Sequence, residues 1–236
     1  MGTSRLNFCF LSGLPRTGSS ALSAILSQNP NIYAGPNSPI CQLMWDTQVS
    51  CTSAAAEQLA ATNRPDFQDE LVGGIPKKFY DHVLASVVVD KCRSWTLPDN
   101  MAMIRRYITS QPRVVVMTRP IDDIVTSFID IYRKNGFDVT ESKLLADGSE
   151  PIMRAYQGVE WARLSNEGEF LFVEYADLVE APTDTLNSIY EFCEWEPFVH
   201  DFNNIVCAYP ENDSYTGIFG LHDVRPKLGY RVAQPV

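Results

Sequence analysis

A short apolar run, a loop bounded by glycines and a helical pattern follow one another within the first thirty residues of this chain. Residues 6–11 (LNFCFL) are mostly apolar, which is typical of a strand that other elements cover on both faces. Residues 13–20 (GLPRTGSS) form the loop, and apolar side chains then recur at helical spacing until Asn29 and Pro30 end the pattern. We therefore expect a buried strand that leads through a tight loop into a helix.

Further strand and helix patterns alternate along the 236 residues. Apolar runs predict strands at residues 87–90, 113–118 and 170–173, and helical patterns occupy residues 101–110, 120–132 and 182–193. The pattern at 120–132 begins with a proline and two aspartates and continues as one apolar stripe, as in an amphipathic helix. The alternation predicts an α/β fold of the P-loop type, with three layers and a central parallel sheet that carries helices on both faces.

Two regions between these elements are less regular. Residues 40–62 have a helical pattern with an alanine-rich middle, whereas residues 63–78 contain prolines and paired glycines that predict a loop. We expect one domain over residues 1–236, in which residues 31–86 and 135–168 are helical or loop insertions around the sheet.

The charge balance and the cysteines disfavour several classes of protein. The 19 Lys and Arg against 29 Asp and Glu give a net charge of −10, which argues against nucleic acid as a partner but allows a local basic pocket. The six cysteines form no CxxC pair and no zinc-ligand cluster, so we predict neither a disulfide scaffold nor a metal site. The sequence shows neither a signal peptide nor a run long enough to span a membrane, which favours a cytoplasmic protein.

The loop at residues 13–20 has the chemistry of a phosphate site. Its two glycines have the spacing of a P-loop, in which backbone N–H groups and the following helix N-terminus converge on phosphate oxygens. Ser19 occupies the place of the P-loop lysine, and the positive charge lies instead at Arg16. This loop suits one phosphate or phosphosulfate held without obligatory Mg²⁺; the simpler alternative is a tight strand-to-helix turn.

The loop resembles the 5′-phosphosulfate loop of sulfotransferases that use PAPS, 3′-phosphoadenosine 5′-phosphosulfate. The arginine form is typical of the bacterial and Golgi-type branches of that family. Residues 114–128 are similar to the family's second motif, in which an arginine and a serine eight residues later bind the 3′-phosphate; here they are Arg119 and Ser127. Weaker resemblances lie at residues 90–95, 172–182 and 220–226.

The resemblance implies roles for individual residues. The residues implied to hold the nucleotide are Pro15, Arg16, Thr17, Gly18, Ser19, Ser20, Arg119, Ser127, Arg225 and Lys227. Among them, Arg16 would also stabilise charge on the bridging oxygen, and Arg225 and Lys227 would close over the nucleotide as a lid. Lys91 would point at the sulfuryl group from a strand end, although a solvated lysine is an equal alternative. Asp90 before it also permits interpretation as a Walker B aspartate that holds Mg²⁺.

The general base has no clear place in the sequence. Two branches of the family place it where this chain has Arg93, or Asn37 and Ser38, and none of these side chains accepts a proton at neutral pH. Weak candidates elsewhere are Asp46, His82 and His222. The aromatic side chains of Trp45, Trp95, Tyr156 and Trp161 line an acceptor pocket or belong to the core, and the core is the more common place for them.

The sequence therefore predicts a sulfotransferase. The sulfuryl group would move in line from PAPS to a hydroxyl or amine, and adenosine 3′,5′-bisphosphate would leave, without a metal or redox cofactor. The acceptor would be a small molecule, a lipid or a glycan, and residues 31–86 and 135–168 would shape its site. Two alternatives stay open at this point: a P-loop kinase or NTPase, and a module that binds adenosine 3′,5′-bisphosphate without catalysis.

Overall fold

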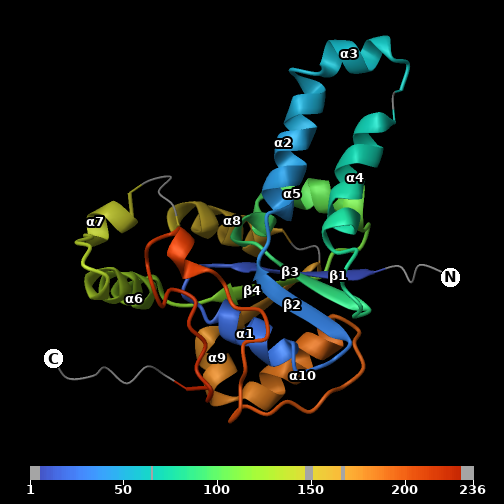
Figure 1. Cartoon of the computed structure of the whole chain (residues 1–236). Coiled ribbons are helices and arrows are strands. Elements are labelled where there is room, and N and C mark those ends of the chain that lie inside the picture. Colours follow the sequence, from blue (N-terminus) through green and yellow to red (C-terminus); the bar gives the residue numbers. More distant parts are fainter. Residues whose placement is uncertain (1–5, 65, 147–150, 166–167, 230–236) are drawn as a thin grey trace.

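The chain folds around a five-stranded parallel sheet. The computed structural model describes residues 6–64, 66–146, 151–165 and 168–229. The strands are β1 (Asn7–Gly13), β2 (Ile32–Asn37), β3 (Val87–Lys91), β4 (Val114–Thr118) and β5 (Phe170–Glu174). Their order in the sheet is β2-β3-β1-β4-β5, and every neighbouring pair is parallel. The predicted parallel sheet is confirmed (Figure 1).

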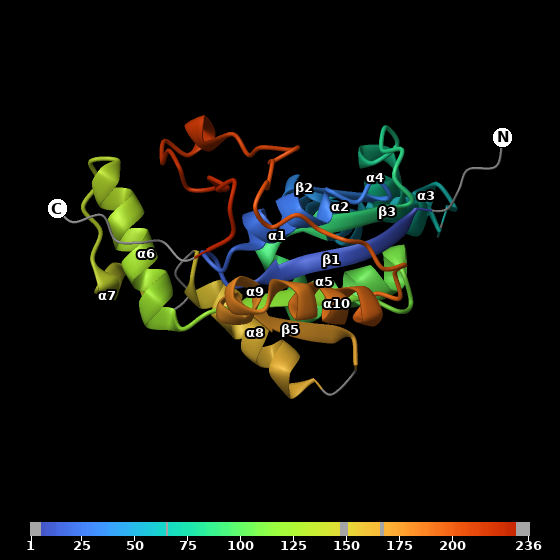
Figure 2. The ribbon, with the colours of Figure 1, turned by 90° about the horizontal axis from the view of Figure 1, so that it is seen from below.

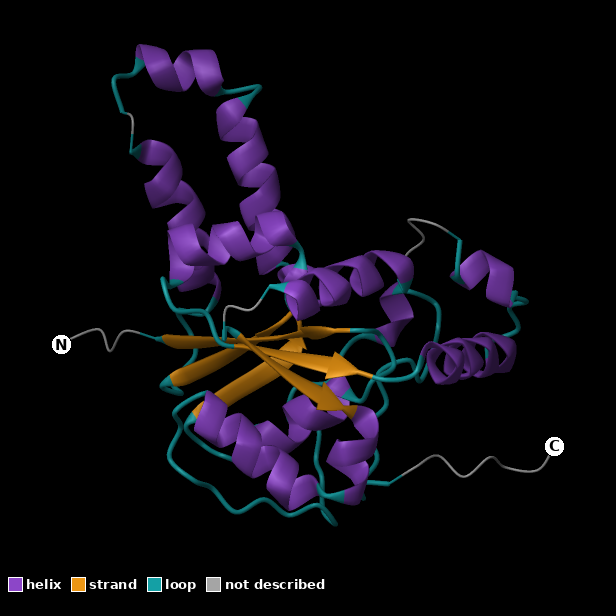
Figure 3. Cartoon of the chain, turned by 180° about the vertical axis from the view of Figure 1, so that it is seen from behind, coloured by secondary structure: helices purple, strands orange, loops and turns teal. Residues whose placement is uncertain are grey.

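Helices cover both faces of this sheet (Figure 3). One layer contains α1 (Ser19–Leu26), α9 (Tyr175–Glu180) and α10 (Pro182–Phe192). The other contains α2 (Ile40–Thr52), α4 (Phe67–Phe79), α5 (Pro98–Met103) and α8 (Met153–Leu164). The helices α6 (Ile121–Lys134) and α7 (Glu141–Leu144) lie beyond the carboxyl ends of the strands (Figure 2). The remaining helical segments are α3 (Ala56–Ala61), the 3₁₀ turns Arg93–Thr96 and Asp213–Tyr215, and the π-helical turn Ile104–Ile108.

Side chains alternate between the two layers along each central strand. Phe10 of β1 and Val88 of β3 pack in the core of the second layer, whereas their neighbours Leu11 and Val89 pack in the core of the first. Strands buried on both faces need apolar residues at successive positions, which is why they appear in the sequence as continuous apolar runs. The three-layer prediction is therefore confirmed by the distribution of the core.

Residues 32–37 form an edge strand that the sequence analysis missed. Gly35 and Pro36 lie inside β2, and the register against β3 shifts between Ala34 and Asn37. An edge strand tolerates proline because one side of its backbone needs no ladder partner. The first part of the region 31–86 thus belongs to the sheet.

The region 40–78 forms a helical arm rather than one helix and a loop (Figure 1). The expected helix at 40–62 is broken at Ser53, whose backbone is not helical, into α2 and α3. The prediction of a loop at 63–78 is wrong, because α4 spans Phe67–Phe79 with Pro76 inside it. Val72, Gly73 and Pro76 are buried there, so packing of α4 in the core outweighs the poor helix propensity of glycine and proline.

The carboxyl ends of the strands, the N-terminus of α1 and the segment 205–229 lie at one end of the molecule (Figure 2). Parallel α/β sheets hold ligands at this end, where the loops after the strands meet. All six cysteines lie in the described part of the chain and are free thiols. No described helix is both long enough and apolar enough to cross a lipid bilayer.

A substitution at the end of β1 tests the packing that this arrangement requires. Gly13 has a φ of +116°, and a Cβ there would overlap the backbone of Met117 in β4. We expect Gly13→Ala to lower the free energy of unfolding by about 3 kcal/mol or more, measured by urea denaturation. Gly74→Ala is the matched control, because its Cβ meets no atom within 4 Å and lies inside α4. A Gly13→Ala variant as stable as the Gly74→Ala variant would contradict this packing.

Candidate active site

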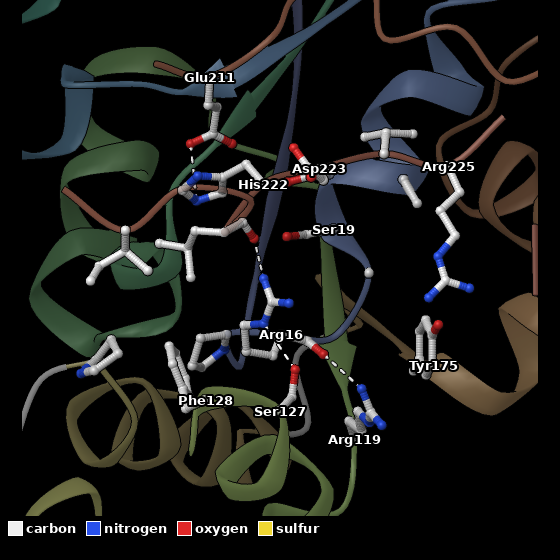
Figure 4. Close-up of a pocket in the computed structure, with 18 of the residues that line it drawn as sticks. Arg16, Ser19, Arg119, Ser127, Phe128, Tyr175, Glu211, His222, Asp223 and Arg225 are labelled. Atoms are coloured by element: carbon white, nitrogen blue, oxygen red, sulfur yellow. Dashed lines mark hydrogen bonds and ion pairs between the residues drawn. The ribbon is translucent and has the colours of Figure 1, made fainter. Parts of the chain in front are cut away.

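A cavity of about 770 Å³ lies at the carboxyl end of the sheet. Its walls come from the loop after β1, from α1 and α6, and from the segment 205–229 (Figure 4). The predicted nucleotide-binding residues that line it are Pro15, Arg16, Gly18, Ser19, Ser20, Arg119, Ser127, Arg225 and Lys227. The fold thus brings nine positions from three distant parts of the sequence to one cavity.

The loop after β1 is shaped by left-handed backbone and by one buried hydroxyl. Gly18 and Arg16 have φ values of +82° and +60°. Thr17 is fully buried, and its hydroxyl donates to the carbonyl of Leu14 at 2.7 Å, so it holds the loop together from inside. The first hydrogen bond of α1 joins the N–H of Leu22 to the carbonyl of Gly18. The N–H groups before Leu22 have no partner within the helix, and such groups are suited to bind an anion.

The two strongest motifs meet through Arg16. Its Nε donates to the hydroxyl of Ser127 at 3.1 Å, although 111 residues separate the two. Arg119 donates from Nη1 to the carbonyl of Arg16 at 3.2 Å and from Nε to Asp123 at 3.3 Å. The guanidinium of Arg119 also lies over the ring of Tyr175, 4.8 Å from its centroid. Both arginines thus lie in one connected cluster beside the loop (Figure 4).

Lys91 is buried at the end of β3, with 4% of its surface exposed, and is not a solvated lysine. Its Nζ donates to the hydroxyl of Ser20 at 3.3 Å and pairs with Glu211 at 2.5 Å. The other oxygen of Glu211 accepts from Asn37 at 2.7 Å. Sequence reasoning missed Glu211, because it lies 120 residues from Lys91 in a segment without periodic structure.

Asp90 is a structural carboxylate rather than an open metal ligand. It accepts hydrogen bonds from Ser38 at 2.6 Å and from Tyr80 and Trp95 at 2.7 Å each. Burial raises the pKa of this carboxyl above its ordinary value, against the opposing effect of the three donors. Both oxygens are engaged, which disfavours the Walker B interpretation. Trp95 is fully buried and belongs to the core.

The three candidate bases lie in different places. Asp46 and His82 are exposed and do not line the cavity, whereas His222 lines it. Arg93 and Asn37, at the places where relatives carry the base, also line the cavity. None of the other three aromatic candidates lines it, because Trp45, Tyr156 and Trp161 pack against the core.

The charge around the cavity is mixed, in contrast to the net charge of the chain. Its basic lining residues are Arg16, Arg93, Arg119, Arg225 and Lys227, and its acidic ones are Asp123, Asp130, Glu211 and Asp223. Asp123 and Glu211 are paired with Arg119 and Lys91. Arginine forks and backbone N–H groups are the donors that phosphate oxygens require, so this donor set fits a nucleotide with separate phosphate groups.

Comparison with known proteins agrees with this chemistry. The sequence model of the sulfotransferase family, described as "Sulfotransferase family", matches residues 9–200. No curated protein sequence matches the chain.

Solved structures show the same fold at low sequence identity. A sulfotransferase from Alicyclobacillus acidocaldarius is 15% identical, with a TM-score of 0.57, and the similarity covers 93% of each chain. The sulfotransferase domain of the Synechococcus PCC 7002 olefin synthase is 18% identical, with a TM-score of 0.53, over 84% of this chain and 77% of that one. A sulfotransferase domain from the curacin biosynthetic pathway is 14% identical, with a TM-score of 0.54, over 82% and 75%.

The family match spans well over half of the chain, and the loop after β1 that it includes lines the cavity described above. The protein therefore belongs to the sulfotransferase family.

Proposed function

We propose that this enzyme transfers the sulfuryl group of PAPS to a hydroxyl or amine of an acceptor and releases adenosine 3′,5′-bisphosphate. The observation that carries the proposal is the contact between the two motifs. Arg16 of the first bonds Ser127 of the second, and Arg119 bonds the carbonyl of Arg16. A site built for one phosphate group needs only the loop, whereas PAPS carries phosphate at both ends of its ribose.

The described residues offer a partner for each of the two phosphate-bearing ends of PAPS. The loop N–H groups with Ser19 and Ser20 would hold the 5′-phosphosulfate, and Arg119 with Ser127 would hold the 3′-phosphate. Arg225 and Lys227 line the same cavity from the C-terminal segment and would close over the nucleotide.

Transfer would proceed by in-line displacement. A bond forms between the acceptor oxygen or nitrogen and sulfur, while the bond from sulfur to the bridging oxygen breaks. The acceptor loses a proton, and the bridging oxygen leaves with the bisphosphate and a growing negative charge. Arg16 of the loop and Lys91, which donates to Ser20, would stabilise that charge.

Two rival functions are less well supported. A P-loop kinase needs a lysine where this chain has Ser19, and a carboxylate free to hold Mg²⁺ where Asp90 is engaged by three donors. A non-catalytic binding module would need only the nucleotide contacts. The buried Lys91 beside the loop favours catalysis over binding alone, because burial of an ammonium group is costly.

The acceptor would be a small molecule, a lipid or a glycan. Among the described residues, Asn37 from the region 31–86 and Pro151 from the region 135–168 line the cavity. These two positions support a role of both regions in shaping the acceptor site. The remaining wall comes from α6 and from the segment 205–229, which includes the exposed Tyr215.

Calorimetry with nucleotides tests the proposal. Adenosine 3′,5′-bisphosphate and ATP are titrated into the protein, each with Mg²⁺ and with EDTA, and consumption of PAPS is then measured with a panel of hydroxyl and amine acceptors. We expect metal-independent binding of the bisphosphate that is tighter than that of ATP. A preference for ATP with Mg²⁺ would indicate a kinase, and binding without transfer to any acceptor or to water would indicate the non-catalytic module.

Replacement of Arg119 tests how the 3′-phosphate is recognised. We expect Arg119→Ala to weaken binding of adenosine 3′,5′-bisphosphate by roughly 10- to 100-fold, the value of a charge-assisted hydrogen bond, and to affect adenosine 5′-phosphate much less. Arg133→Ala is the matched control, since Arg133 lies near the end of α6, the helix that follows Arg119, and is exposed outside the cavity. Equal weakening of both nucleotides would show that Arg119 does not bind the 3′-phosphate.

Replacement of Arg16 separates charge stabilisation from binding. We expect Arg16→Ala to lower the turnover of PAPS by about 100-fold or more, because a donor aimed at the leaving oxygen is lost, with a smaller effect on bisphosphate affinity. Arg16→Lys retains the charge and should recover part of the turnover. Loss of affinity without loss of turnover would contradict this role.

A further inference from the structure

The cavity contains a histidine that neither family motif predicts as a catalytic group. His222 is the only imidazole among the described residues that line the cavity, and 24% of its side chain is exposed. The two lining residues at the places of the family's bases do not accept protons. Arg93 is a guanidinium, and the amide nitrogen of Asn37 donates to Glu211.

The carboxylates in the cavity are poorer bases than this imidazole. Asp123 accepts from Arg119, and Glu211 accepts from Lys91 and Asn37. Asp130 and Asp223 are exposed to solvent. A group that takes a proton near neutral pH is most effective when its own pKa is close to that pH, which favours histidine.

Asp213 holds His222 in one orientation. The ring donates from Nδ1 to Oδ1 of Asp213 at 2.6 Å, and the backbone N–H of His222 donates to Oδ2 at 3.3 Å. Burial raises the pKa of Asp213, but these hydrogen bonds outweigh it and hold that pKa below its ordinary value. A charged carboxylate on Nδ1 fixes the tautomer in which the lone pair of the neutral ring is on Nε2.

The second nitrogen connects His222 to the strand-end lysine. Nε2 lies 3.3 Å from Oε2 of Glu211 (Figure 4). The other oxygen of Glu211 pairs with Lys91 at 2.5 Å. Lys91 in turn donates to Ser20 of the phosphate loop. The imidazole is therefore tied, through one carboxylate, to the two groups expected nearest the sulfuryl group.

We propose that His222 is the general base of the reaction and that Asp213 is its positioning residue. This inference rests on the proposed function. In the transfer step, the acceptor gives its proton to Nε2 as its bond to sulfur forms and the bond from sulfur to the bridging oxygen breaks. The resulting imidazolium lies between the carboxylates of Asp213 and Glu211, which stabilise its charge, and it returns the proton to solvent after products leave.

The charges around the ring suit a base that becomes cationic during the reaction. The charged groups that face His222 are Asp213 and Glu211, with Lys91 behind Glu211 and Asp223 next along the chain. The two carboxylates would stabilise the imidazolium that forms when the ring takes the proton of the acceptor. Loss of the ring should therefore lower turnover, while binding of the bisphosphate persists.

Three variants test the proposal by the rate at which PAPS is converted to the bisphosphate. The acceptors are water alone, phenol, and 4-nitrophenol, which is largely ionised above neutral pH and needs no base. We expect His222→Gln to slow the reaction with water or phenol by about 10²- to 10⁴-fold. The reaction with 4-nitrophenol should slow much less. Asp213→Asn should lower kcat with little change in KM for PAPS.

His82→Gln is the matched control, because His82 is an exposed histidine outside the cavity. Calorimetry with adenosine 3′,5′-bisphosphate checks that the variant cavities are intact, and affinities within about threefold of the wild type are expected. A His222→Gln enzyme that keeps the wild-type rate with water and phenol overturns the assignment and leaves the proposed function standing. A wild-type protein that binds the bisphosphate but consumes no PAPS with any acceptor overturns both.

Discussion

The close approach of β1 to β4 is the constraint on which the site depends. Gly13 ends β1 directly against the backbone of Met117, and the N–H of Leu14 donates to the carbonyl of Met117 at 2.9 Å. This contact places the phosphate loop beside the residues that follow β4. A Cβ at Gly13 would overlap the backbone of Met117, so the glycine permits the close approach of the two strands that carry the motifs of Arg16 and Ser127.

A buried ion pair distinguishes this cavity from a site that only binds phosphate. Lys91 and Glu211 are an ion pair whose side chains are 5% and 10% exposed. Removing two charges from water costs several kcal/mol each, and a pair of this kind is weak support for stability. Its position at the carboxyl end of β3 instead favours a role in chemistry, where a desolvated ammonium interacts strongly with developing negative charge.

Much of the fold could be predicted from the sequence, and the failures have physical causes. Strands β1, β3 and β4 are buried on both faces, and the half-buried edge strand β5 packs against both cores, so their apolar runs identify them. The edge strand β2 contains Gly35 and Pro36, which local rules assign to a turn. The helix α4 exists because Val72 and Pro76 are buried against distant residues, and no short window of sequence contains that information.

In the site, too, local sequence patterns identify some residues, whereas contacts between distant residues leave no pattern. Glycine spacing and the resemblance to a known family pointed to Arg16, Arg119 and Ser127, which line one cavity. Glu211 and Asp213 could not be predicted in this way. Glu211 pairs with Lys91 and Asp213 with His222, and no short sequence pattern links the members of either pair. Long-range ion pairs inside irregular segments leave no local signature.

Part of the cavity wall comes from the segment 205–229, so the cavity is complete only when this segment has folded. All strands of the sheet precede α9, whereas Glu211, His222 and Arg225 come later in the chain, in a segment whose Ile218 and Val224 also pack against the two apolar cores. Contacts between the first twenty residues and this segment span almost the whole sequence, and contacts of such high sequence separation are slow to form. Formation of the sheet therefore does not by itself complete the cavity. A chain whose sheet is fully formed is still an incomplete enzyme until its last irregular segment folds back over the phosphate loop.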